Sequence, residues 1–404
     1  MKINNIMTMF LTFTLVAAAP IFPLSHVNEV ESAVATPAQV IQVGNVEELY
    51  AAVNDSRNAG ATLTLASGVY MLSETDLAGV GRANGGRLDL LENMSLMGVE
   101  GDRNAVVIDA INLPSSSYRV PIVVAAVRLG RGRNSIEWLT VRNAVNGMAN
   151  IDTTLQWQGT AFVRIAHVAS TGGQRGLDVR NAGDLGASGE TIDAEFVDND
   201  FFNNNRGALN QGLRIVNLRT GPGTVINARM IGNRFWGQHM GRVLANNGST
   251  NSTVHVFSSG NRAFGNGAGT VIIGANAGAP ANGNAIDLQA HGDHFVDNTA
   301  TPFPDLGGGL VVLGGDNVSL SANVVNNNTV HVSLWGCRIE GNGTWDIFAV
   351  GARSIPESVG APGVNNHVTI EINGEGRGRW EPVEFFADSI PHDPSLNNSV
   401  TVIR

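Results

Sequence analysis

The sequence is poor in lysine and in cysteine. Lys2 is the only lysine among the 404 residues, so the rest of the chain cannot use a lysine Schiff base, a P-loop lysine or a lysine general base. Cys337 is the only cysteine, which excludes an intramolecular disulfide and any zinc site built on several cysteines. With 25 basic against 35 acidic residues, the net charge of −10 argues against a nucleic-acid-binding protein.

The N-terminus has the features of a secretory signal peptide. Lys2 precedes an apolar run over residues 6–19, and Ala33 and Ala35 match the small-x-small pattern of a signal peptidase site. The run is shorter than the roughly 20 residues that a membrane-spanning helix needs. We therefore predict that residues 1–35 are removed and that residues 36–404 are secreted, to the extracellular space or the periplasm, without a membrane span.

A repeat organises the second half of the chain. Short runs rich in β-branched residues alternate apolar and polar positions, which is typical of strands with one buried face. Their first apolar residues recur at intervals of 28 to 44 residues, a period that indicates stacked supersecondary units. The markers are Ile192, Ile226, Val254, Ile286, Val330, Val368 and Val400.

Each unit contains three short strands, which is typical of a coil of a parallel β-helix. A turn residue follows seven positions after each of the first five markers, where Asn and Asp suit a sharp bend; these residues are Asn199, Asn233, Asn261, Asp293 and Cys337. A β-propeller is the alternative, but its four-stranded blades need roughly 40–50 residues. We predict an all-β fold: one right-handed, single-stranded parallel β-helix over residues 36–404.

A short amphipathic helix precedes the first strands. Asn45 is a suitable N-cap, and Val46, Leu49 and Val53 form an apolar stripe, so we expect a helix over about residues 45–57. A solenoid needs its first coil covered, and this helix is placed to cover it.

Residues 46–72, with this helix, an apolar strand and Gly68-Val69-Tyr70, resemble the start of pectin-lyase-like right-handed β-helix proteins. Val106-Val107-Ile108-Asp109 and the Asn-bearing turns are similar to that superfamily as well. The family includes polysaccharide lyases, polygalacturonases, pectin esterases, phage tailspikes and adhesins. The resemblance implies a substrate cleft on the third strand of each coil and, in the lyases, an arginine that abstracts a proton.

Stacked coils would align equivalent outward residues about 4.8 Å apart. One such column contains His255, Asp287 and His331, in which a carboxylate between two imidazoles suits a general acid or base. Arg229 lies in the next column, and we name these four as candidate catalytic residues. A solvated polar face is the alternative interpretation of the same pattern.

A third column is cationic. Guanidinium groups present forked donors that suit the carboxylates or sulfates of an acidic polysaccharide. We name four candidate substrate-binding residues from this column: Arg234, Arg262, His294 and Arg338. An arginine ladder neutralised by nearby acids is the alternative.

The third strands, by contrast, are mostly apolar, as at Leu244, Ile272, Val311 and Leu313, and no complete catalytic signature of the family is present. Three carboxylates, those of Asp293, Asp297 and Asp305, are candidate metal ligands. Calcium is the metal that they suit, because calcium prefers several oxygen ligands. We therefore expect a secreted carbohydrate-active protein, a lyase or hydrolase whose partner is an acidic polysaccharide. The alternative is a non-catalytic surface protein that binds glycans.

Overall fold

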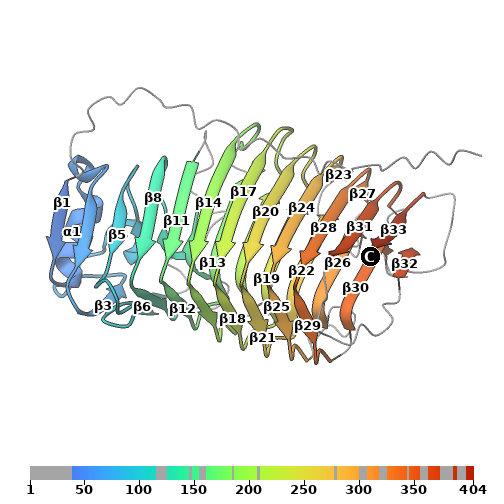
Figure 1. Cartoon of the computed structure of the whole chain (residues 1–404). Coiled ribbons are helices and arrows are strands. Elements are labelled where there is room, and N and C mark those ends of the chain that lie inside the picture. The colour runs from blue at the N-terminus through green and yellow to red at the C-terminus, as the bar shows by residue number, and fades with distance from the viewer. Residues whose placement is uncertain are drawn as a thin grey trace, which may run out of the picture. The chain divides into compact units, whose positions relative to one another are not determined.

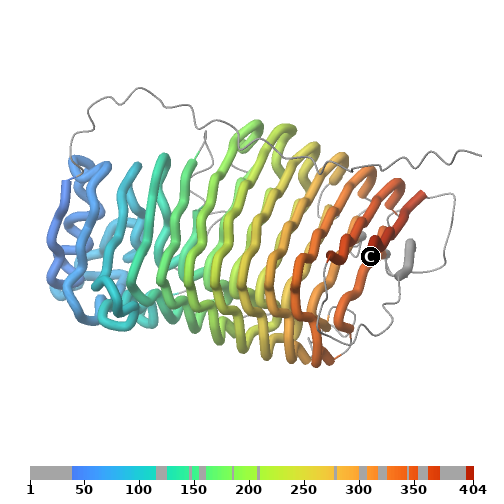
Figure 2. The backbone as a smooth tube through the Cα atoms, in the orientation of Figure 1, coloured from blue at the N-terminus to red at the C-terminus, as the bar shows by residue number. Residues whose placement is uncertain are grey.

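The computed structural model describes residues 39–114, 125–144, 148–153, 161–183, 186–206, 210–276, 280–299, 307–317, 325–343, 345–354, 363–373, 385–388 and 397–404. These residues form a right-handed parallel β-helix, in which every strand pairing between coils is parallel (Figure 1). The chain passes in turn through three long sheets and then starts the next coil, as the backbone tube in Figure 2 shows. The prediction from the repeat is confirmed.

The first strand of each coil belongs to a twelve-stranded sheet. Its strands, in order, are β1 (Val40–Val43), β2 (Thr62–Leu65), β5 (Ser95–Met97), β8 (Arg133–Glu137), β11 (Ala161–Ala166), β14 (Thr191–Val197), β17 (Val225–Ile231), β20 (Thr253–Ser259), β24 (Ala285–His291), β28 (Thr329–Trp335), β31 (His367–Asn373) and β33 (Ser399–Ile403).

The second strand of each coil belongs to a nine-stranded sheet, and from β9 onward it is three residues long. Its strands are β3 (Gly68–Ser73), β6 (Val106–Asn112), β9 (Thr140–Arg142), β12 (Ala169–Thr171), β15 (Asp200–Phe202), β18 (Arg234–Trp236), β21 (Arg262–Phe264), β25 (His294–Val296) and β29 (Arg338–Glu340).

The third strand belongs to a ten-stranded sheet, and two further strands, β23 (Ala281–Asn282) and β27 (Val325–Asn326), pair separately. The ten strands are β4 (Leu88–Asp89), β7 (Ala125–Arg128), β10 (Ala149–Asp152), β13 (Arg175–Ala182), β16 (Gln211–Leu218), β19 (Met240–Asn247), β22 (Ala268–Asn276), β26 (Gly308–Asn317), β30 (Trp345–Ser354) and β32 (Phe385–Asp388).

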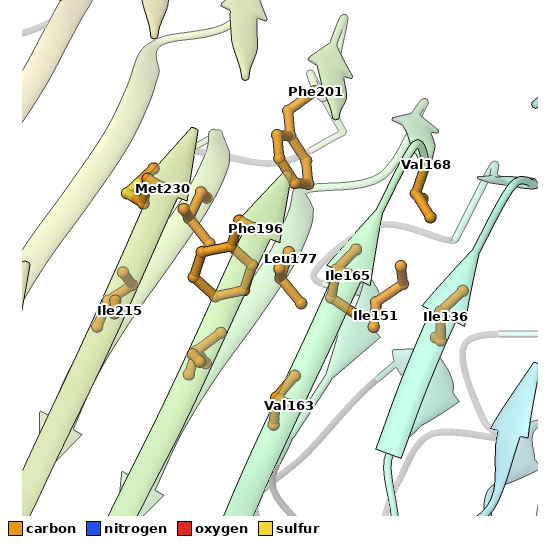
Figure 3. Close-up of a cluster of buried hydrophobic side chains, with 14 of the residues drawn as sticks. Ile136, Ile151, Val163, Ile165, Val168, Leu177, Phe196, Phe201, Ile215 and Met230 are labelled. Atoms are coloured by element: carbon orange, nitrogen blue, oxygen red, sulfur yellow. The ribbon is translucent and has the colours of Figure 1, made fainter. Parts of the chain in front are cut away.

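The predicted phase of the coils is confirmed. The seven marker residues are successive register partners in the twelve-stranded sheet, and the first six are buried. They belong to one continuous apolar core, part of which Figure 3 shows around Ile165, Phe196 and Met230. Because side chains alternate along a strand, the residues directly before and after each marker face outward.

The helix α1 (Val46–Asn54) covers the first coil, with Leu49 and Val53 buried, and the 3-10 helices η1 (Ser56–Asn58) and η2 (Ala83–Gly86) follow. α1 is shorter than predicted because Asp55 leaves the helical conformation and caps η1 instead. Asn45 accepts a hydrogen bond from the Glu48 N–H as the expected N-cap.

The turn residues do not act as we expected. The left-handed conformation lies one position earlier, at Asp198, and the buried Asn199 accepts the backbone N–H of Val168 in the preceding coil. In the next coil, the Asn233 Oδ1 accepts the backbone N–H of Asn199 at 3.1 Å. These asparagines therefore form a ladder that satisfies buried backbone groups between coils.

Candidate functional site

The outward row of the ten-stranded sheet changes character along the solenoid. In β4 through β16 its register partners are the charged residues Asp89, Arg128, Asp152, Asp178 and Arg214, and in β19 through β30 they are Val243, Val271, Val311 and Phe348. The expectation of an apolar third strand is therefore correct only for the later coils. Val311 and Leu313 are buried in a second apolar cluster on the outer side of this sheet, whereas Leu244 and Ile272 belong to the main core.

The charged half of this row is the centre of a buried ionic cluster. Asp178, which is 0% exposed, lies within 4 Å of three arginines: Arg214 makes two hydrogen bonds to it, and Arg175 and Arg180 lie 3.8 and 3.9 Å away. Arg180 also pairs with Asp152 at 3.0 Å. A second pair, Arg128 and Asp89, continues the row toward β4.

These surroundings shift the pKa values within the cluster. Burial alone would raise the pKa of Asp178, but the charges of Arg214, Arg180 and Arg175 outweigh it and hold the carboxyl well below its usual range. Burial, together with the charge of Arg214, lowers the pKa of Arg175 to about 10. Asp178 is thus ionised at neutral pH, and the pKa of Arg175 lies below that of an ordinary arginine.

Arg175 is also the arginine of this cluster with the weakest contact to a carboxylate. Its Nε donates to the Gln211 Oε1 at 3.2 Å, and its side chain is 19% exposed. The sequence signal for the cluster exists, because Asp152, Asp178 and Arg214 each follow an inward apolar residue of their strand. The repeat predicted from the sequence begins at Ile192, so it does not include the strands that carry Asp152 and Asp178.

The predicted catalytic column is a true register row on the twelve-stranded sheet: His255, Asp287 and His331 are successive partners. His331 Nδ1 lies 2.9 Å from Asp287 Oδ1, and its Nε2 lies 3.3 Å from Glu371 Oε1, a residue that we had not named. The structure brings His331, rather than His255, into hydrogen-bonding contact with Asp287.

The hydrogen bond to Asp287 raises the pKa of His331 above its ordinary value; burial opposes this, and Glu371 adds to it. The pKa of Asp287 is lowered overall, because the bond and the charge of His331 outweigh the effect of burial. Arg229 stands apart: it lies in the next row and pairs with Glu195 at 2.7 Å.

The predicted binding column is also a register row, on the nine-stranded sheet. Arg234 is held by Asp200 through bonds of 2.6 and 2.7 Å, and Arg338 pairs with Glu340. Arg262 lies over the ring of Phe264, with its guanidinium carbon 4.6 Å from the centroid. A stack of Phe202, Trp236 and Phe264 runs beside these cations, with centroids 4.7 and 5.6 Å apart.

The calcium hypothesis does not fit Asp293. This residue is 0% exposed and lies in the core, where Arg242 Nη2 is 2.9 Å from its Oδ2 and the Asn261 N–H is bound to its Oδ1. Both carboxylate oxygens are therefore engaged. Asp305 lies outside the described residues, and within the described ones no group of three acidic, histidine or cysteine side chains could hold a metal ion.

The sequence matches no family model and no curated protein. Solved structures match over most of the chain. The A-module of a mannuronan C-5 epimerase from Azotobacter vinelandii is 14% identical with a TM-score of 0.41, covering 89% of this chain and 95% of its own.

Two phage tailspikes match more weakly. The Dettilon tailspike protein is 13% identical with a TM-score of 0.32, covering 88% of this chain and 64% of its own. Tailspike protein 3 of bacteriophage CBA120 is 12% identical with a TM-score of 0.21, covering 87% and 58%. The strand pairing itself shows that the chain has a parallel β-helix fold. Within the described residues, none of the helices could cross a bilayer.

Proposed function

We propose that this β-helix protein binds an acidic polysaccharide on the outer face of the ten-stranded sheet and cleaves it by β-elimination. The support is the ionic cluster, in which three arginines surround one buried carboxylate. Guanidinium groups in such a protected setting bind carboxylates strongly. The resemblance to the lyases also implies that this face of the solenoid carries the cleft.

Arg175 is the residue that we assign to proton abstraction. Burial lowers the pKa of its guanidinium to about 10, so the neutral form that can accept a proton is more accessible than in an ordinary arginine. The lyases of the superfamily imply an arginine in this role, and Arg175 combines the lowered pKa with partial exposure.

In the proposed reaction, the neutral Arg175 takes the proton from C5 of a uronate residue. The electron pair left on C5 is delocalised into the carboxylate, whose growing negative charge is stabilised by nearby guanidinium groups such as that of Arg214. Expulsion of the oxygen at C4, which takes a proton from the Arg175 guanidinium directly or through water, then forms a C4–C5 double bond, breaks the glycosidic link and restores the neutral base. No water is consumed, and the unsaturated product absorbs in the ultraviolet.

The experiment is a panel of polyuronates incubated with the purified protein and followed by ultraviolet absorbance. We expect absorbance to rise on at least one polymer, and Arg175→Met to lower the rate at least 100-fold. Arg57→Met is the matched control, because Arg57 is exposed and pairs only with its neighbour Asp55. No absorbing product on any polymer, or full activity in Arg175→Met, would overturn the proposal.

The same panel tests our other predictions for the site. If His331 or Arg229 is catalytic in glycan cleavage, then His331→Ala or Arg229→Met will stop it, whereas our assignment to Arg175 predicts that both variants remain active. Arg262→Met tests the binding row and should weaken binding to the polymer. Retained glycan binding with no lyase, reducing-sugar or esterase activity would instead favour the non-catalytic surface protein.

A further inference from the structure

A serine lies beside the His331–Asp287 pair on the twelve-stranded sheet. Ser333 Oγ is 3.5 Å from His331 Nε2, and Asp287 Oδ1 is 2.9 Å from the other ring nitrogen. The three side chains thus form a chain from hydroxyl to imidazole to carboxylate. In structures without substrate the bond between nucleophile and base is often long, so 3.5 Å is within reach.

The strand geometry explains how these groups meet. Ser333 and His331 are two positions apart on β28, so both side chains point outward. Asp287 is the register partner of His331 on β24, which places the carboxylate at the ring nitrogen that faces away from Ser333. The three side chains therefore come from two adjacent coils, and two of them occupy alternate positions of one strand.

We propose that Ser333, His331 and Asp287 form an esterase site, which hydrolyses short acyl esters such as O-acetyl groups on a polysaccharide. Ser333 is the nucleophile, His331 the base, and Asp287 the group that orients the imidazole. This activity is separate from the elimination proposed above, because it uses another face of the solenoid and another reaction.

The surroundings supply the other parts of such a site. Gln289, the register partner of Ser333, carries two amide N–H donors, of which one is bound to Asp287 Oδ2 at 3.2 Å. The second donor would stabilise an oxyanion formed at Ser333. Trp335 and Phe257 are 48% and 41% exposed, and they offer apolar surface to the acyl or sugar group.

The ester is hydrolysed in two covalent steps that need no cofactor. The Ser333 oxygen attacks the ester carbonyl while its proton passes to His331 Nε2, and the sugar oxygen leaves with that proton. The acyl-serine is then attacked by water, whose proton is again taken by His331, and this releases the carboxylic acid and restores Ser333.

Glu371 makes the activity depend on pH. It accepts a hydrogen bond from Ser333 at 3.2 Å and also lies 3.3 Å from His331 Nε2, so it competes for both groups. Together with Asp287 it favours the protonated imidazole, whereas the base must be neutral; the next titratable group of this row, His255, lies beyond Asp287. The rate should therefore rise with pH through the raised pKa of His331.

The experiment uses hydrolysis of p-nitrophenyl acetate by the full protein, and labelling by a fluorophosphonate located by mass spectrometry. Ser333 is only 5% exposed, so a small acyl group is the appropriate probe. We expect Ser333→Ala to lower kcat/KM at least 100-fold and to abolish labelling. Ser135→Ala, an outward serine of the same sheet on β8, is the control and should leave both unchanged.

Two further variants separate a catalytic role from a structural one. Glu371→Gln should shift the pH–rate profile to lower pH, because one carboxylate that holds the proton on His331 is lost. Arg175→Met should keep full esterase activity, so failure of the elimination proposal and failure of this one are distinguishable. Labelling at another residue, wild-type turnover in Ser333→Ala, or an unshifted profile in Glu371→Gln would overturn the esterase site.

Discussion

The buried pair of Arg242 and Asp293 allows a quantitative test of the solenoid core. Arg242 is 1% exposed and occupies an inward position of β19, where its register partners are Leu213 and Thr270. Its guanidinium bonds Asp293 at 2.9 Å and the hydroxyls of Ser258 and Thr270 at 2.6 Å each. A charge in this position depends on its partner, because removal of the carboxylate leaves a cation without solvent or counter-ion.

Asp293→Asn removes that charge with little change of shape. The new side chain keeps the oxygen that accepts the Asn261 N–H, so the asparagine ladder continues through this coil. We expect a loss of about 3–5 kcal/mol in the free energy of unfolding. In urea denaturation followed by tryptophan fluorescence, this corresponds to a midpoint lower by about 1 M.

The double variant gives the decisive comparison. In Arg242→Met with Asp293→Asn, an apolar side chain replaces the cation and an asparagine completes the ladder, so stability should return to within about 1 kcal/mol of the wild type or exceed it. If Asp293→Asn unfolds at the wild-type midpoint, or if the double variant loses the sum of the two single effects, this account of the core is wrong.

Three further outcomes are expected. Asn233→Ala should cost about 1–3 kcal/mol in chemical denaturation, because the buried N–H of Asn199 loses its acceptor, whereas Asn227→Ala on the outer face should change stability by less than about 0.5 kcal/mol. Burial and the charge of Asp293 raise the pKa of the Cys337 thiol to about 11, so a thiol reagent at pH 8 should label it only after denaturation; labelling of the native protein at the denatured rate would contradict its burial. N-terminal sequencing of protein exported by a bacterial host should begin at residue 36, and a retained Lys2 would exclude cleavage of a signal peptide.

Much of the fold could be predicted from local patterns. Alternation of apolar and polar residues identified the strands around Ile226, Val254 and Ile286, and the register among them follows, because slipping by one residue would turn the apolar set outward. Asn199 and Asn233 were recognised as turn residues, but not as a ladder, because their partners lie a whole coil away.

The phase of the coils follows from the pattern of apolar residues alone, since only one face of each strand can be buried. The same phase predicts that Asp287 and His331 share one row. Only the folded chain shows which outward groups lie in contact: Ser333 and Glu371 beside His331, and three arginines around Asp178. The physical reason is that outward residues tolerate almost any polar side chain, so their partnerships depend on the register and rotamers of neighbouring coils 30 or more residues away.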